Sequence, residues 1–191
     1  MSLNSIIIVS GLPRSGTSMM MSMLEAGGMR LLTDDSRKAD EDNPKGYFEY
    51  ERVKQIEYNK SWLEDSKGKA VKMISELLRY LPEGYFYKVI FMKRNMKEIL
   101  ASQRQMLIRR GKPENTISSE KMAELFEQHL RDIKTWLEAQ PNMEVIYINY
   151  NEIIEKRREE ELERVNLFLG KRLCVKKMIR VIDKRLYRQR K

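Results

Sequence analysis

The feature that most constrains this chain is a short apolar run that leads directly into a glycine loop. Residues 6–9 read Ile-Ile-Ile-Val, a composition typical of a buried strand in a parallel sheet. Gly11 and Gly16 then frame a Gly-x-x-x-x-Gly loop, and a helix-forming run at 19–26 ends at two further glycines. This order aims backbone N–H groups and a helix N-terminus at an anion. We therefore expect a phosphate-like group to bind after the first strand, unless the loop is an ordinary strand-to-helix turn.

The loop lacks the lysine that nucleotide triphosphatases use. Thr17 and Ser18 stand where such enzymes carry Lys-Ser or Lys-Thr. Their lysine neutralises the β- and γ-phosphates, and the hydroxyl that follows it holds magnesium. Arg14 is the cation of this loop, and its planar guanidinium suits a tetrahedral oxyanion. The sequence thus predicts a site for one phosphate-like group and a neighbouring anion, without a metal.

Further apolar stretches alternate with helical patterns along the chain. Strands are expected at residues 6–10, 70–74, 87–92 and 145–148, and longer helices at 96–110, 119–139 and 159–169. This alternation predicts an α/β fold in three layers, with a parallel sheet of four to five strands flanked by helices, and a P-loop-like nucleotide-binding architecture. One domain is expected over residues 1–191. The polar segment 33–60 is expected to lie over the carboxyl edge of the sheet, where ligands of such folds bind.

The positive charge of the chain is concentrated at its C-terminal end. The net charge is +9, and residues 171–191 hold ten Lys or Arg against one acid, whereas the first 170 residues are balanced. Such a segment is either a solvated helix or tail, or a contact for a phosphorylated ligand, nucleic acid or an acidic membrane. Cys174 is the single cysteine, which excludes an internal disulfide. We expect a cytoplasmic protein, since neither a signal peptide nor the roughly 20 apolar residues of a membrane span are present.

A second anion-binding signal follows the third expected strand. Arg94 stands at the end of that strand, and Asn95 with Glu98 is typical of a helix N-cap with its capping-box partner. Ser102 lies eight positions after Arg94, about 80° around the helix, so an anion beside the helix can reach both. Taken alone, the pattern fits equally well an exposed arginine and a serine that have no binding function.

Together the two signals resemble the sulfotransferases that use 3′-phosphoadenosine 5′-phosphosulfate (PAPS), in particular small bacterial members. The 5′-phosphosulfate loop of this family, Pro-[Lys/Arg]-Ser-Gly-Thr-[Ser/Thr], is matched by Pro13, Arg14, Ser15, Gly16, Thr17 and Ser18. Its 3′-phosphate site, an arginine at a strand end and a serine eight positions later, is matched by Arg94 and Ser102. Segments 149–154 and 168–170 also look like that family and extend the resemblance over residues 5–170.

The resemblance implies transfer of a sulfuryl group from PAPS to a hydroxyl or amine, in line and without metal, leaving 3′-phosphoadenosine 5′-phosphate (PAP). It implies that Arg14 stabilises charge on the bridging oxygen. Glu49 is the candidate general base, because residues 43–49 look like a segment of bacterial members. A small-molecule or carbohydrate-like acceptor is expected, and nucleic acid is not. Whether two copies of the chain form a homodimer that shares the acceptor pocket is left open.

Other basic residues have plainer interpretations. The single histidine, His129, is expected to be packed or to lie at an interface rather than to be catalytic. Lys72 is expected to lie at the surface, although it could reach the sulfuryl group. Four tail residues could close over the 3′-phosphate: Arg180, Lys184, Arg185 and Arg188. The alternatives to a sulfotransferase are a P-loop kinase-like phosphotransferase and a non-catalytic binder of phosphoadenosine or nucleic acid.

Overall fold

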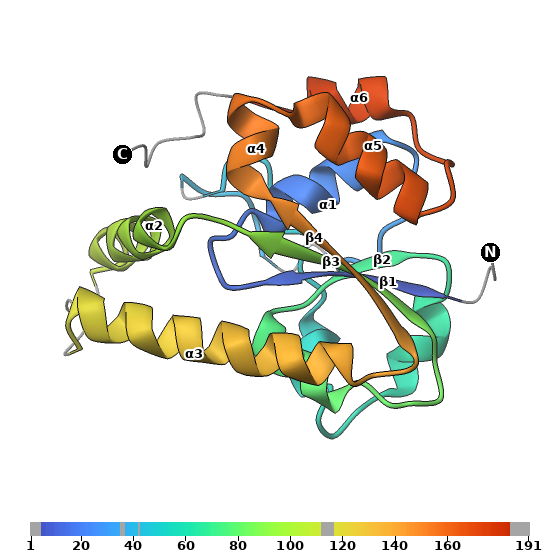
Figure 1. The fold of residues 1–191 in the computed structure, drawn as a ribbon, viewed down its shortest axis with the longest axis horizontal. Helices are drawn as coiled ribbons and strands as arrows, with labels where there is room; N and C mark the ends of the chain where they lie inside the picture. The colour runs from blue at the N-terminus through green and yellow to red at the C-terminus, as the bar shows by residue number, and fades with distance from the viewer. Residues whose placement is uncertain (1–4, 35–36, 42, 112–116, 184–191) are drawn as a thin grey trace.

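A parallel four-stranded sheet forms the centre of the structure, a computed structural model that describes residues 5–34, 37–41, 43–111 and 117–183 (Figure 1). The strands are β1 (Ile6–Gly11), β2 (Ala70–Lys72), β3 (Tyr87–Lys93) and β4 (Met143–Asn149). They lie in the order β2-β1-β3-β4, and every pairing is parallel. The predicted α/β class is therefore confirmed, with four strands in the sheet.

Helices cover both faces of this sheet, which confirms the predicted three layers (Figure 1). The α-helices are α1 (Thr17–Ala26), α2 (Met96–Arg109), α3 (Ser119–Glu138), α4 (Tyr150–Glu155), α5 (Arg158–Phe168) and α6 (Val175–Arg180). Three 3₁₀ segments add η1 (Glu51–Gln55), η2 (Ser61–Ser66) and η3 (Ser75–Tyr80). The three long helices begin and end within a residue of their predicted limits. Helices α4 and α6 were not predicted, because each is only six residues long and shows little periodicity.

Residues 6–9 of strand β1 are all apolar because the two faces of the strand bury different cores. Ile7 and Val9 belong to a cluster with residues of α1, α4, α5 and α6. Ile6 and Ile8 belong to a second cluster with the 3₁₀ segments and α3. A strand covered on both sides needs no polar alternation, which is why its sequence reads as a continuous hydrophobic run.

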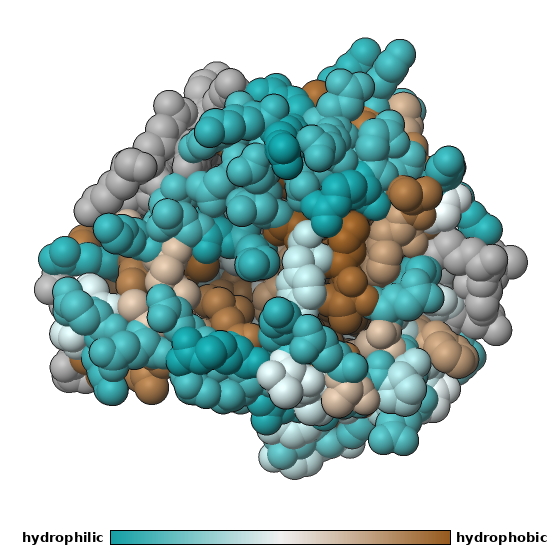
Figure 2. All heavy atoms as spheres, viewed as in Figure 1, coloured by the Kyte–Doolittle hydropathy of each residue, from teal (hydrophilic) through white to brown (hydrophobic). Residues whose placement is uncertain are grey.

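The apolar side chains of α3, among them Leu125, Ile133 and Leu137, are only partly buried. Its C-terminal half packs on the sheet through Ile133 and Leu137, both 1% exposed, whereas Leu125 in the N-terminal half is 47% exposed. Figure 2 shows a mainly hydrophilic face, with hydrophobic atoms along its middle, where the edge strand β4 runs. Within the described ranges, no helix combines the length and the apolar character that a membrane crossing requires.

Candidate functional site

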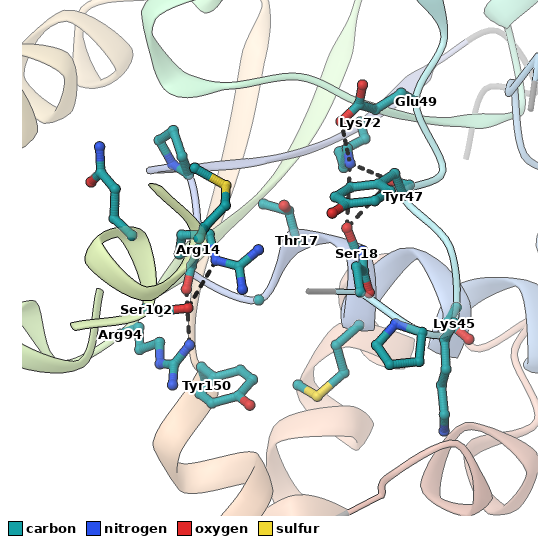
Figure 3. A pocket seen from close by; sticks show the side chains of 18 of the residues that line it. Arg14, Thr17, Ser18, Lys45, Tyr47, Glu49, Lys72, Arg94, Ser102 and Tyr150 are labelled. Atoms are coloured by element: carbon teal, nitrogen blue, oxygen red, sulfur yellow. Dashed lines mark hydrogen bonds and ion pairs between the residues drawn. The ribbon is translucent and has the colours of Figure 1, made fainter. Parts of the chain in front are cut away.

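A cleft of about 410 Å³ opens at the carboxyl ends of β1, β2 and β3 (Figure 3). Its walls come from the glycine loop after β1, the start of α1, Arg37 with residues 43–49, the end of β2, α2, α4 and residues 181–183. Ligands of parallel α/β sheets bind at this edge. Of the residues predicted to bind the donor or to act in catalysis, Ser15 is buried, and the others line the cleft: Pro13, Arg14, Gly16, Thr17, Ser18, Glu49, Arg94 and Ser102.

The loop after β1 has a backbone conformation that depends on glycine. Gly16 has a φ of 101° and precedes the first residue of α1. A Cβ at this position would lie 2.4 Å from Cδ2 of Tyr150, so a side chain there would collide with α4. Arg14 also has a positive φ, 72°, in the left-handed region that residues other than glycine seldom adopt. Such backbone strain persists where surrounding contacts hold it and is common at functional sites.

The N-terminus of α1 faces the cleft and has no side-chain cap. The first N–H groups of a helix have no partner within it, and the helix dipole makes this end positive. Thr17 and Ser18 add hydroxyl groups at the same place. Ser15 is 1% exposed, and its hydroxyl makes no hydrogen bond with any described residue. The loop therefore offers backbone and hydroxyl donors to an anion.

Arg14 connects the two signals found in the sequence. Its Nε donates to Oγ of Ser102 over 2.8 Å, and its backbone oxygen accepts from Nη1 of Arg94 over 3.0 Å. Figure 3 shows these three side chains on one side of the cleft, with Tyr150 beside Arg94. The glycine loop and α2 thus form a single wall.

The side chain of Arg94 lies in a buried network and is not exposed. Its Nε donates to Oε2 of Glu98 over 2.9 Å, and the two side chains are 8% and 6% exposed. Its guanidinium carbon lies 4.4 Å from the centroid of the Tyr150 ring, within the range of a cation–π contact. Asn95 caps α2 as predicted. The predicted capping-box partner, Glu98, instead accepts hydrogen bonds from Arg94 and Asn151.

Lys72 enters the cleft from the end of β2, across from Arg14 (Figure 3). Its side chain is 11% exposed, so the expected surface position is wrong. The ammonium donates to the backbone oxygen of Tyr47 and to Oγ of Ser18, the latter over 3.3 Å. Burial lowers the pKa of Lys72 from 10.5 to about 8, and the carboxylate of Glu49 opposes this shift. Lys72 is therefore mostly protonated at neutral pH and loses its proton just above it.

Glu49 lies on the same wall and is paired with two cations. Its Oε1 accepts from Nη1 of Arg37 over 3.1 Å and lies 3.6 Å from Nζ of Lys72. Arg37 also stacks on Tyr47, with 3.3 Å between the guanidinium carbon and the ring centroid. The hydroxyl of Tyr47 donates to the carboxylate of Asp40 over 2.7 Å. These contacts hold this polar segment against the cleft, close to the position expected for it.

His129 is not among the residues that line the cleft. Its Nε2 lies 2.8 Å from Oγ of Ser75, and its Nδ1 lies 3.2 Å from Oε2 of Glu76. Both partners belong to η3, on the face of the sheet that α3 covers. The expectation of a packed histidine is confirmed.

The C-terminal segment reaches the cleft before its most basic stretch. Val181 and Asp183 line the cleft, and Nζ of Lys45 donates to the backbone oxygen of Val181 over 2.5 Å. Arg180 is exposed on α6 and is not part of the lining. Lys184, Arg185 and Arg188 lie outside the described residues, so their closure over a 3′-phosphate stays a prediction.

Sequence reasoning missed three residues that shape the cleft, Tyr150, Arg37 and Tyr47. Tyr150 could have been found, since it follows the last strand directly and the carboxyl edge of a parallel sheet gathers ligand-binding groups. Arg37 and Tyr47 come from an irregular segment whose path is fixed by tertiary contacts. No periodicity points to them.

The lining of the cleft is basic. Among the residues that the structure describes, two acidic side chains contribute, Glu49 and Asp183, against seven basic ones: Arg14, Arg37, Lys45, Lys72, Arg94, Arg109 and Arg110. The same described ranges contain no group of three or more His, Cys, Asp or Glu side chains placed to hold a metal ion. This composition suits a ligand with several negative charges.

Comparison with known proteins identifies the family. The sequence profile described as "Sulfotransferase domain" matches residues 4–191, so the chain belongs to the sulfotransferase domain family. This confirms the resemblance drawn from the two motifs. No curated protein sequence matches this chain.

A solved structure supports the same fold. The mouse sulfotransferase SULT7A1 complexed with PAP superposes with a TM-score of 0.54 at 20% identity, over 97% of this chain. This chain spans 64% of the length of that mouse protein. A sulfotransferase domain from the curacin biosynthetic pathway gives a TM-score of 0.49 at 15% identity, with 89% of this chain and 75% of that one covered. Retinol dehydratase in complex with androsterone and inactive cofactor PAP gives 0.48 at 17% identity, with 92% and 62% covered.

Proposed function

We propose that this chain transfers a sulfuryl group from PAPS to a hydroxyl or amine of a small-molecule or carbohydrate-like acceptor, in line and without a metal. The observation that carries the proposal is the contact between Arg14 and Ser102, because it joins the glycine loop and the α2 site in one basic cleft. Two anion sites on one cleft fit a donor with a 5′-phosphosulfate and a separate 3′-phosphate. The membership of the sulfotransferase domain family supports the same reading.

The loop suits the 5′ end of the donor. The hydroxyl of Ser15 is buried without a partner among the described residues, and Gly16 lets the ring of Tyr150 pack against the loop where a Cβ would collide with it. Pro13 shapes the loop, and the N–H groups at the start of α1, with the hydroxyls of Thr17 and Ser18, would hold the phosphosulfate. A helix N-terminus with no carboxylate in its first turn favours such an anion.

The α2 wall suits the 3′-phosphate. Arg94 and Ser102 would contact it, and the distinction between this donor and ordinary nucleotides would depend on them. Arg109 and Arg110 line the cleft further along α2 and add positive charge. Arg94 is held by Glu98 and Tyr150, so its guanidinium is ordered before a ligand arrives.

The catalytic groups would lie on both walls. Bound PAPS would supply an activated sulfuryl group whose transfer passes through a loose transition state, by analogy with phosphoryl transfer. Arg14 from one wall and Lys72 from the other would stabilise the negative charge that develops. Glu49 would take the proton from the acceptor hydroxyl or amine. Its pairing with Arg37 and Lys72 would orient the carboxylate toward the cleft.

A kinase-like reading finds less support in these residues. The lysine of a phosphate-binding loop is replaced by Thr17. The described acidic residues of the cleft are Glu49 and Asp183, and Glu49 is committed to two cations. Magnesium sites of such enzymes use carboxylates and hydroxyls around the phosphates.

Thermal unfolding with candidate ligands tests the proposal. PAP at one hundred times its dissociation constant should stabilise the native state by about 2.7 kcal/mol and raise Tm by about 5–10 °C, whereas ATP with magnesium should not. Arg14→Ala should abolish the shift, and Arg157→Ala, which removes an exposed ion pair with Glu160, should keep it. A shift with ATP and magnesium alone would favour a kinase. A response to polynucleotide alone would favour a non-catalytic binder.

A further inference from the structure

We propose that Glu98 and Asn151 are positioning residues that hold Arg94 and, through it, the Arg14 loop in the geometry that binds the donor. The inference rests on the proposed function and adds two residues that do not line the cleft. Neither would touch the donor. Their effect would pass through Arg94.

Glu98 is a buried carboxylate with both oxygens engaged. The residue is 5% exposed, Oε2 accepts from Nε of Arg94, and Oε1 accepts from Nδ2 of Asn151, each over 2.9 Å. A buried charge is costly unless it is paired and hydrogen bonded. The carboxylate is thereby tied to this one arrangement of Arg94, which fixes the guanidinium from the α2 side.

Asn151 connects the beginnings of two helices. Its Oδ1 accepts from the backbone N–H of Asn95 over 3.2 Å, while its Nδ2 holds Glu98. Its own backbone N–H donates to Oδ1 of Asn149, the cap of α4. Asn151 therefore locks the start of α4 to the start of α2. This contact also places Tyr150, the preceding residue, beside Arg94.

Arg94 connects Glu98 and Asn151 to the glycine loop. One face of its guanidinium lies against Tyr150, Nε is paired with Glu98, and Nη1 donates to the backbone oxygen of Arg14 over 3.0 Å. That oxygen belongs to a residue with a φ of 72°, a conformation that needs outside support. The side chain of Arg14 is held separately by Ser102. If Arg94 were held less firmly, the strained backbone at Arg14 would lose its support. At the same time the guanidinium of Arg94 would move away from the predicted 3′-phosphate site.

A second buried carboxylate, paired with a half-exposed arginine, offers a control. Glu161 on α5 is also 5% exposed, pairs with Arg164, and lies 3.4 Å from the backbone nitrogen of Asn149. It does not line the cleft. Glu161→Gln therefore removes an equally buried negative charge from a nearby helix. The glutamine keeps an oxygen that can accept from the backbone N–H of Asn149, so the cap of α4 and the contacts of Arg94 are left in place.

The experiment compares Glu98→Gln, Asn151→Ala and Glu161→Gln with the wild-type protein, well below each Tm. Calorimetric titration with PAP should give about tenfold weaker binding for the first two variants and an unchanged affinity for the control. Amide hydrogen exchange should be faster over residues 11–18 in the same two variants and unchanged in the control. Asn151→Ala leaves the Arg94–Glu98 pair intact, so it carries the test if Glu98→Gln does not fold.

The outcomes separate this inference from the proposed function. Wild-type affinity for PAP in both variants, or equal losses in the variants and the control, would overturn the positioning role. Failure of the wild-type protein itself to bind PAP would overturn the proposed function. Exchange over residues 11–18 would then still decide whether Glu98 and Asn151 hold the loop, and unchanged exchange would refute it.

Discussion

Replacing Lys72 by methionine should make the protein more stable and less active. The two side chains have similar length, so packing is largely kept. The pKa of Lys72 falls from 10.5 to about 8 on folding, mainly because the ammonium is buried. At about 1.4 kcal/mol for each pKa unit, the folded state disfavours the charged side chain by about 3 kcal/mol at pH 7.

Part of this gain is lost with the hydrogen bonds that Lys72 donates. The backbone oxygen of Tyr47 and Oγ of Ser18 would lose a donor, at a cost of about 1 kcal/mol. Glu49 keeps its contact with Arg37, so no carboxylate is left without a cation. The net expectation for Lys72→Met at pH 7 is about 2 kcal/mol of added stability, or about 4–8 °C in Tm.

The pH dependence supplies the stricter test. Since the folded pKa of Lys72 lies below the unfolded one, the unfolded chain binds more protons between about pH 8 and 10.5, and wild-type stability rises with pH over that window. The advantage of Lys72→Met, measured by urea unfolding at pH 7 and pH 9.5, should therefore shrink. A variant that is less stable at pH 7, or an advantage that does not change with pH, would refute the reasoning.

The same shift predicts how activity depends on pH. If protonated Lys72 stabilises developing charge, conversion of PAPS to PAP should fall as the pH rises through about 8. Lys72→Arg should remove that decline, because a guanidinium keeps its charge. Lys72→Met should be slow at every pH, although it is the more stable protein.

Three further changes probe other parts of the cleft. Glu49→Gln should lower PAPS turnover by about 100-fold or more and leave PAP affinity within about twofold, and near-wild-type turnover would reject the base assignment. Gly16→Ala should cost at least about 2 kcal/mol in urea unfolding and abolish PAP binding, since its Cβ meets Tyr150, whereas Gly46→Ala, also at positive φ but with open space, should cost less. Truncation after Asp183 should weaken PAP binding if the removed basic residues close over the 3′-phosphate, and unchanged affinity would defeat that idea.

The fold was largely predictable because its strands carry strong local signals. The run at residues 6–9 is apolar without alternation, as a strand buried on both faces must be. β2 ends at Lys72, two residues before the predicted limit, and the 3₁₀ segment η3 begins at Ser75. The exact ends of a strand depend on tertiary packing. Sequence periodicity therefore predicts that a strand exists better than it predicts where the strand ends.

The site was predictable where a motif ties residue type to spacing. The glycine loop, Arg94 and Ser102 converge on one cleft, as their places after two strands imply. The surface position expected for Lys72 was wrong, because its charge was weighed without its place at the end of β2, next to β1. The hydrogen bond between Glu98 and Asn151 joins residues 53 positions apart in the sequence. Local sequence patterns predicted only a capping box for Glu98.

The central claim is tested most directly by incubating the protein with PAPS in the presence of EDTA and separating PAP from PAPS by chromatography. With a suitable hydroxyl or amine acceptor added to take the sulfuryl group, the wild-type protein should release PAP, and Arg14→Ala should be reduced to the uncatalysed background. Equal rates for the two proteins, or turnover of ATP with magnesium in place of PAPS, would contradict the account.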